Sequence, residues 1–343
     1  MAIAVAQSAA PPLLPGDPAL TASTLLPLVT LIGDRLLVSL TGDPTSSMNI
    51  FPWAKLFVKF LQNLNEFFVK FFERNVSMLT LDGVDVMGQR LVEEVLEVIQ
   101  RKPNLKKISF VAHSVGGLVA RYAIGKLYRA LKTENVEDSS ISGSEEDSRG
   151  TIGGLEAMNF VIVATPHLGS RGNRQLRIHL IFRRTGRHLF LINFDEGKPP
   201  LLKRMIEDYD DCYFMSALCT FKRRMLYSNV GYDHIVGWRT SSIRRNFEQP
   251  KWEDTVNENY PHVVYEEHCK ACDDEESKST SVDNDNSDKL EEELVTGLSC
   301  MSWEKVDVSF QNSRQRFAAY SIIQIELHTV VHMISIFHLL CLP

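Results

Sequence analysis

The chain has 343 residues, of which 44% are hydrophobic and 23% are charged. This composition is typical of globular proteins and excludes a collagen-like, coiled-coil or wholly disordered chain. The formal net charge of −6 at pH 7 argues against a general nucleic-acid-binding protein. Residues 273–293 contain ten acidic residues and two lysines, so the rest of the chain has a net charge of +2. Their composition predicts a disordered acidic insert.

The cysteines and the N-terminal sequence indicate the compartment. Six cysteines are too few for a disulfide framework, which favours a reducing compartment, and we expect a cytoplasmic protein. Cys269 and Cys272 form one CxxC next to His268, and no second pair completes a zinc site, so we expect no metal. The first 20 residues lack the basic start of a secretory signal; because they are poor in acids, a plastid is the alternative compartment. The absence of a long apolar run predicts no transmembrane helix.

The N-terminal part differs in character from the rest of the chain. Residues 1–50 are expected to be mostly irregular, with one apolar island at Leu25–Leu40. Residues 51–73 carry an aromatic stripe with helical spacing, which predicts an amphipathic helix over 51–72. Such a helix packs on a core, or its aromatic residues and lysines bind a membrane surface or a partner. We therefore divide the chain into a divergent segment, 1–73, and a domain, 74–343.

From residue 81 onward, predicted helices and strands alternate. The pattern predicts an amphipathic helix ending near Gln100, a strand over 106–111, a helix over 118–131, and strands over 158–164, 225–230 and 306–310. Strands that alternate with helices indicate a mostly parallel sheet with helices on both faces.

One turn in this pattern points to chemistry. In Phe110-Val-Ala-His-Ser-Val-Gly-Gly, a buried strand leads into Ser114 and a helix follows, with Ala112 two residues before the serine and Gly116 two after. Small residues at these positions fit a nucleophile elbow, the sharp strand-to-helix turn of G-x-S-x-G. We expect this turn to expose the Ser114 hydroxyl. The Val115 N–H, at the helix N-terminus, would then help to bind an oxyanion.

The sequence around this turn resembles a known family. The segments Leu79–Leu91, Ile108–Tyr128, Ala164–Gly172 and Asn229–Thr240 are similar to the DUF676 "putative serine esterase" family of lipase-like α/β hydrolases, plant-type members included. The resemblance covers residues 74–325 approximately. It implies an α/β-hydrolase-like fold and a Ser, Asp or Glu, His triad in that chain order.

The resemblance also implies roles for other residues. Asp233, in YDHIVG, matches the acid, although an aspartate that caps a turn would fit there too. The position where the family has its histidine base is Tyr320, and a neutral phenol accepts a proton poorly at pH 7. His332 matches a second family histidine and is the best remaining base, with His328 and His338 nearby. We expect His167 to line the pocket and His113 to pack and hydrogen-bond at the elbow.

Two further segments bear on activity. Family members have an upstream strand and a loop that supplies a second oxyanion N–H; we find no such loop in residues 1–72, so the N-terminal strands are expected to be missing or replaced. Residues 171–187 are rich in arginine and follow a strand where lipase-like enzymes often insert a lid. They are either solvated surface or a contact for phosphate head groups or an anionic membrane.

These observations support two hypotheses. The first is a serine hydrolase that cleaves carboxylic esters, in particular lipid esters, through an acyl-enzyme, without a cofactor or metal and with peripheral membrane contact. The second is a catalytically impaired or truncated relative that binds a lipid or a protein. Tyr320 and the missing oxyanion loop motivate the second hypothesis.

Overall fold

A computed structural model describes eleven segments of the chain. They are residues 34–41, 67–71, 74–75, 77–130, 150–170, 183–192, 197–209, 211–249, 260–271, 286–314 and 316–323. All of them belong to one compact unit, Ile32–Pro343, and the other unit, Met1–Leu31, lies outside the described residues.

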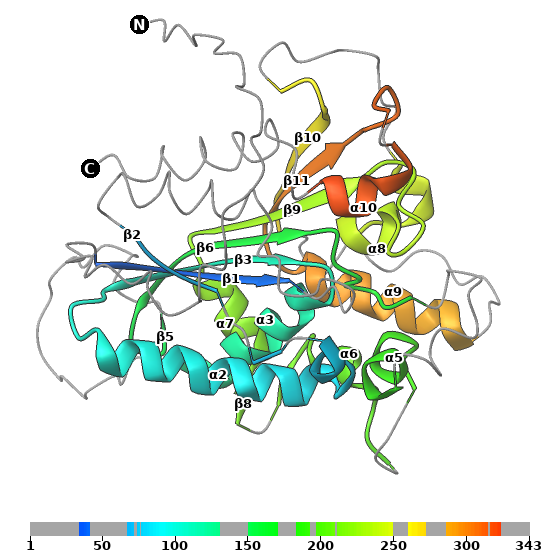
Figure 1. Ribbon diagram of the computed structural model, residues 1–343. Coiled ribbons are helices and arrows are strands. Elements are labelled where there is room, and N and C mark those ends of the chain that lie inside the picture. The colour runs from blue at the N-terminus through cyan, green and yellow to red at the C-terminus, as the bar shows by residue number, and fades with distance from the viewer. Residues whose placement is uncertain are drawn as a thin grey trace, which may run out of the picture. The chain divides into compact units, whose positions relative to one another are not determined.

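The main sheet has the strand order β10-β11-β9-β6-β3-β1-β2 (Figure 1). In chain order its strands are β1 (Arg35–Thr41), β2 (Phe67–Phe71), β3 (Lys107–His113), β6 (Glu156–Val163), β9 (Arg223–Asn229), β10 (Val263–Cys269) and β11 (Trp303–Val308). Neighbouring strands are parallel except β10 and β11, which pair antiparallel at one edge. The predicted mostly parallel α/β sheet is therefore confirmed.

The strand β1 corrects two expectations about the N-terminal part. It pairs in parallel with β3 along its whole length, from Arg35↔Lys107 to Thr41↔His113. Residues 35–41 are therefore not irregular, and a strand of this region is present rather than missing. Leu36, Leu37 and Val38 are fully buried. A strand buried on both faces is a continuous apolar run without alternation, which is why its pattern is not distinctive.

The strand β2 corrects a third expectation. Phe67–Phe71 lies within the predicted helix 51–72, but it forms the edge strand next to β1. Phe-Phe-Val-Lys-Phe fits a helical stripe and also has high β propensity, and pairing with β1 decides between the two. Residues 51–66 lie outside the described residues. Because β1 and β2 belong to the same sheet as β3, the division of the chain at residue 73 separates strands of one sheet.

Helices cover both faces of this sheet. On one face lie α2 (Val84–Arg101), α3 (Val115–Leu127), α7 (Phe214–Thr220) and α9 (Asn286–Ser299), and on the other lie α8 (Trp238–Ser242) and α10 (Ala319–Ile322) (Figure 1). The shorter elements are η1 (Ser77–Leu81), β4 (Tyr128–Arg129), β5 (Thr151–Ile152), α5 (Arg183–Leu189), α6 (Leu201–Arg204), β7 (Asp208–Tyr209), β8 (Cys212–Tyr213), η3 (Asn246–Glu248) and η4 (Arg316–Ala318). None of the helices in the described residues is both long and apolar enough to cross a bilayer.

The helix α9 corrects the boundary of the acidic insert. Residues 286–293 were expected to be disordered, but they form the first two turns of this helix. Leu294, Val295 and Leu298 follow at helical spacing and are almost completely buried. Their burial stabilises the helix more than its acidic first turns oppose it. Residues 272–285 lie outside the described residues.

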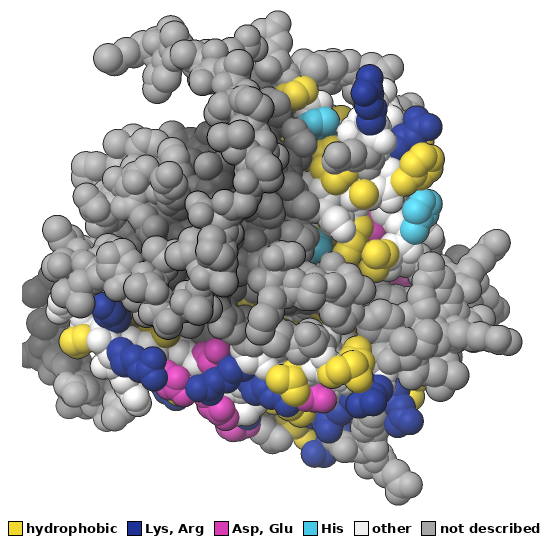
Figure 2. All heavy atoms as spheres, viewed as in Figure 1, with side chains coloured by type: hydrophobic (Ala, Val, Ile, Leu, Met, Phe, Trp, Pro, Cys, Tyr) yellow, Lys and Arg dark blue, Asp and Glu magenta, His cyan; other side chains and the backbone are white. Residues whose placement is uncertain are grey.

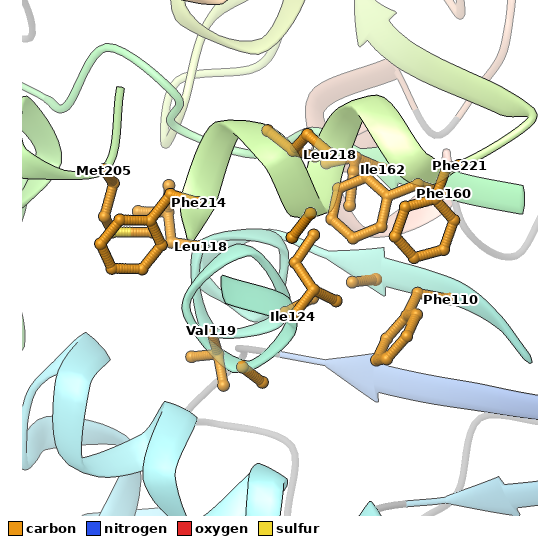
Figure 3. Packing of buried hydrophobic residues seen from close by; sticks show 14 of the residues in the cluster. Phe110, Leu118, Val119, Ile124, Phe160, Ile162, Met205, Phe214, Leu218 and Phe221 are labelled. Carbon is orange, nitrogen blue, oxygen red and sulfur yellow. The ribbon is translucent and has the colours of Figure 1, made fainter. Parts of the chain in front are cut away.

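Alternate side chains of the central strands fill two cores, one on each face of the sheet. Phe110 and Phe160 lie on the α3 side, where Phe221 packs against both, with ring centroids 6.0 and 5.2 Å away (Figure 3). Val111 and Val161 point to the opposite face, where Tyr320 of α10 is part of the second core. The sheet is thereby held between two apolar layers, which fixes the position of the strand ends.

Candidate active site

Ser114 lies on a sharp turn between β3 and α3. Its backbone has φ 57° and ψ −136°, a conformation that residues other than glycine rarely adopt. Three hydrogen bonds hold the turn: the Ser114 N–H donates to the Val163 carbonyl (2.9 Å), and the Ser114 carbonyl accepts from the Gly117 N–H (3.0 Å) and from the Thr165 hydroxyl (2.6 Å). The strand–turn–helix arrangement that the sequence predicts is therefore present.

Close packing explains the small residues around this turn. Ala112 is completely buried at the end of β3. A Cβ atom on Gly117 would lie 2.3 Å from the Thr165 hydroxyl oxygen and 2.8 Å from Ile162 Cγ2. The start of α3 therefore approaches β6 as closely as a glycine backbone allows. This close approach fixes the position of the Val115 N–H, the first of the helix.

Backbone strain recurs along this edge of the sheet. Besides Ser114 after β3, Ala164 follows β6 with φ 44° and Tyr232 follows β9 with φ 60°. Each of the three comes within three residues of the end of its strand. Because these strands are parallel, their carboxyl ends share one edge. Strained residues concentrate at functional sites, so this edge is the candidate active site.

The structure contradicts the expected exposure of the Ser114 hydroxyl. Ser114 is only 3% exposed, and Tyr320 on α10 donates a hydrogen bond of 2.5 Å from its hydroxyl to Ser114 Oγ. Within the described residues this is the one hydrogen bond of the Ser114 hydroxyl, and no histidine nitrogen makes one with it. The phenol occupies the place next to the nucleophile where a general base would lie.

His113 contacts Tyr320 rather than the serine hydroxyl. Its Nε2 lies 3.0 Å from the Tyr320 carbonyl oxygen, and the two rings are 4.8 Å apart. A carbonyl oxygen only accepts, so Nε2 carries the proton and donates it. This nitrogen therefore cannot accept a proton from Ser114. The contact instead attaches α10 to the end of β3.

Asp233 lies in the loop after β9, and its carboxylate caps that loop. Oδ1 accepts from the N–H groups of Ile235 (3.1 Å) and Val236 (2.9 Å), and Oδ2 accepts from Asn229 Nδ2 (3.1 Å). This is the turn-capping arrangement of an aspartate. Within the described residues the carboxylate makes no hydrogen bond to a histidine.

His167 lies deeper in the interior than a pocket-lining residue. It is fully buried, its Nδ1 faces Arg121 Nη1 at 3.4 Å, and its ring lies 6.2 Å from that of Trp303. Burial and the nearby Arg121 and Lys305 charges hold the pKa of His167 well below its usual value. The imidazole is therefore neutral and accepts a hydrogen bond from the guanidinium.

Sequence reasoning missed Arg121, which is almost fully buried on α3. Its Nη2 donates to the Met205 carbonyl (3.0 Å), and burial lowers its pKa to about 10. It also missed the ion pair of Arg244 with Asp307 (2.8 Å), which attaches the segment after α8 to β11. An arginine inside an otherwise apolar helix, as in Leu118-Val-Ala-Arg-Tyr-Ala-Ile124, was the available signal for Arg121.

Other predicted features lie partly or wholly outside the described residues. Four predicted residues lie outside the described residues: His328, His332, His338 and Cys272 of the CxxC pair. Of the arginine-rich segment the structure describes α5, where Arg184 makes an ion pair with Asp85 of α2. Over the described residues, no cluster of three or more His, Cys, Asp or Glu side chains could hold a metal ion.

A mostly parallel sheet between helices, with a serine on a strained turn from a central strand into a helix, defines an α/β-hydrolase-like fold. Comparison with known proteins agrees with this class. The family model described as "Putative serine esterase (DUF676)" matches residues 46–243, more than half of the chain. The chain belongs to this family.

Similar proteins are known from two yeasts and a bacterium. The chain is 29% identical over 180 residues to "Putative lipase ROG1" of Saccharomyces cerevisiae (51% of this chain, 23% of that protein). It is 31% identical over 175 residues to "Putative lipase C4A8.10" of Schizosaccharomyces pombe (48% and 20%). The matches therefore span less than a quarter of these relatives. The solved structure "Phospholipase PlaB from Legionella pneumophila" is similar at a TM-score of 0.36 and 13% identity, covering 60% of this chain and 41% of that one.

Proposed function

We propose that the chain is a serine hydrolase of carboxylic esters, with Ser114 as its nucleophile. The observation that carries the proposal is the strained backbone of Ser114 between β3 and α3. In this turn Ser114 comes directly before the first N–H groups of α3. When Oγ attacks an ester carbonyl carbon, the negative charge that develops on the carbonyl oxygen would then lie next to the Val115 N–H.

The proposed reaction proceeds through an acyl-enzyme. A base takes the Ser114 proton while Oγ bonds to the carbonyl carbon, the alcohol leaves with a proton, and water releases the acid. Asp233 is the proposed acid that orients the base. In this assignment it would exchange at least one of its turn-capping contacts for the base. His332 remains the histidine that the sequence favours as base.

The position of β1 bears on where a second oxyanion donor would lie. In the parallel register, Thr41 lies opposite His113, one residue before the nucleophile. The chain that follows Thr41 therefore starts at the same sheet edge as Ser114, where the family loop that supplies an oxyanion N–H belongs. Residues 42–50, which follow β1, lie outside the described residues.

Lipid esters are the proposed substrate class, since the relatives are named as lipases. Exposed side chains near α10 are consistent with peripheral contact with a lipid surface. Phe317 is 69% exposed and Ile235 57% exposed, and Arg316 lies 5.1 Å from the Phe317 ring. Figure 2 shows hydrophobic, basic and histidine side chains together on this face. Apolar bulk beside cations suits an anionic lipid surface.

The second candidate function is binding of an ester or lipid without turnover. The hydrogen bond from the Tyr320 hydroxyl to Ser114 Oγ favours it. A serine that accepts a hydrogen bond from a phenol has no acceptor for its own proton in that contact. The protein would then retain the fold of a hydrolase without its reaction.

Covalent labelling by a fluorophosphonate probe separates the two functions. The full chain is treated between pH 7 and 9.5, with Ser114→Ala as the test variant and Ser228→Ala, a buried serine of β9, as the matched control. Labelling of the wild type and of Ser228→Ala, but not of Ser114→Ala, supports the hydrolase. Folded wild-type protein without any Ser114-dependent labelling would contradict it and leave the binding function.

A further inference from the structure

Tyr320 is the side chain that the described structure places on the nucleophile. We propose that its hydroxyl is the group that exchanges a proton with Ser114, in place of a histidine, so that the site hydrolyses esters at alkaline pH and is nearly idle at neutral pH. This inference rests on the proposed function and assigns the base of that same site. It replaces His332 in that role.

The geometry meets the requirement for proton transfer. The Tyr320 hydroxyl is 2.5 Å from Ser114 Oγ, well within the distance at which a general base acts. Tyr320 is 8% exposed, so its hydroxyl meets the serine with little competition from water. It lies in the first turn of α10, after the last parallel strand, β11, which is where this fold supplies its base.

Two contacts keep the phenol on the nucleophile. The His113 Nε2–H donates to the Tyr320 carbonyl oxygen, and the His113 ring packs against the phenol ring. Ala319 and Ile323, on either side, are fully buried in the core of that sheet face. Tyr320 is therefore held next to Ser114 by the packing of α10 on the sheet, and not by a surface contact.

The protonation state of the phenol sets the direction of the hydrogen bond. The neutral phenol donates to Ser114 Oγ and cannot take its proton. A phenolate can only accept, so the Ser114 hydroxyl then donates to Tyr320. As Oγ bonds to the carbonyl carbon, the proton moves to the phenolate and the carbonyl π electrons move to the oxygen. Collapse of this intermediate returns the proton from Tyr320 to the departing alcohol.

Other titratable groups lie in or beside the core that holds Tyr320. They are His113 on β3, Tyr227 on β9, Tyr232 and Asp233 after β9, Tyr260 before β10, and Arg316 on η4. The positive charge on Arg316 favours the phenolate, whereas burial and the Asp233 carboxylate oppose it. An ordinary phenol has a pKa near 10, so ionisation at neutral pH is rare.

The test is the pH dependence of hydrolysis of p-nitrophenyl butyrate by the full chain, after subtraction of the rate of Ser114→Ala. We expect the wild-type rate to rise about tenfold per pH unit between pH 7 and 9. Tyr320→Phe should lower the rate at pH 9 by about 100-fold or more. Tyr320→His should raise the rate at pH 7.5 by about 100-fold and flatten the profile above neutral pH.

A control variant and a variant of His332 make the outcomes distinct. Tyr260→Phe removes a phenol hydroxyl elsewhere in the same core and should follow the wild type. Unchanged rates in Tyr320→Phe, or loss of the rate in His332→Asn alone, would overturn the inference and leave Ser114 as the nucleophile. If neither the wild type nor Tyr320→His shows a Ser114-dependent rate or label at any pH, the proposed function fails with it. Circular dichroism and thermal unfolding establish that each variant is folded.

Discussion

Two basic side chains lie buried behind the candidate nucleophile, and they have no acidic partner within the described residues. Arg121 on α3 donates to the Met205 carbonyl, and its Nη1 faces the neutral His167. A buried charge is costly unless it is paired or hydrogen-bonded. The neutral imidazole of His167 is the hydrogen-bond acceptor for the Arg121 guanidinium. The protonation state of His167 therefore affects the stability of this part of the core.

His167 should make the protein sensitive to moderate acid. In the folded protein its pKa lies well below 6.5, because burial and the Arg121 charge disfavour the imidazolium. Below pH 6.5 the unfolded chain therefore binds a proton that the folded chain does not, and stability falls as the pH falls. We expect the wild type to lose about 1.4 kcal/mol per pH unit more than His167→Asn between pH 6 and 5.

Urea unfolding at a series of pH values measures this slope. Asparagine at position 167 retains an acceptor for Arg121 but does not titrate, so His167→Asn should be less stable at neutral pH and have a flatter profile. The control is His268→Asn, which replaces an exposed histidine of β10 and should follow the wild type. An equal slope in the wild type and His167→Asn would show that His167 takes up a proton in the folded state.

At the scale of elements, α2 and α3 approach each other through one glycine. A Cβ atom on Gly88 of α2 would lie 2.3 Å from the Tyr122 ring of α3. Since α3 begins at the nucleophile turn, this contact also determines how α3 lies under the sheet. The requirement is steric, because Gly88 lies within a helix, where alanine would otherwise be favoured.

Gly88→Ala should therefore destabilise the protein despite its better helix propensity. Alanine gains about 1 kcal/mol in propensity, whereas overpacking against Tyr122 costs about 1–3 kcal/mol. We expect a lower urea midpoint and slower fluorophosphonate labelling of Ser114. Gly231→Ala is the matched control, because its Cβ would meet nothing within 4 Å. Equal stability of Gly88→Ala and the wild type would mean that α2 moves away from α3 without a loss of free energy of unfolding.

The elements show which sequence patterns are reliable. The strands around residues 107–113 and 156–163 were predictable because a short apolar run lies between clear breaks, and α2 was predictable because Val84, Met87, Leu91, Val95 and Val98 repeat at helical spacing. The run at 67–71 has aromatic residues that suit either a strand or a helix. Residues 67–71 form a strand because they pair with the free edge of β1.

At the scale of the whole molecule, the ion pairs of Arg244 connect the segment after α8 to the last two strands of the sheet, β11 and β10. Arg244, after α8, donates to Asp307 of β11 (2.8 Å) and to Glu267 of β10 (2.7 Å). The Trp238 indole N–H donates to the other Asp307 oxygen (3.0 Å). These contacts fix the segment between β9 and β11.

Arg244→Met should lower the free energy of unfolding by about 3–5 kcal/mol, because it leaves the Asp307 carboxylate buried without its arginine. The double variant Arg244→Met/Asp307→Asn removes that charge and should regain part of the loss. Lys126→Met is the comparison, since its partner Asp211 is 79% exposed and such pairs contribute about 0–1 kcal/mol. Urea unfolding measures all three. Equal losses in Arg244→Met and Lys126→Met would contradict a structural role for the buried pair.

The sequence by itself determined the α/β alternation, the small residues around Ser114 and the family. These depend on local requirements: the period of the apolar residues, and the space that a strand-to-helix turn leaves for its neighbours. Only the tertiary structure decided that the Ser114 hydroxyl is covered, that Asp233 caps its own loop and that His113 donates to Tyr320. The two contacts of Tyr320, with Ser114 and with His113, join residues about 200 positions apart. They form because parallel strands bring their carboxyl ends to one edge of the sheet. No local pattern in the chain encodes that proximity.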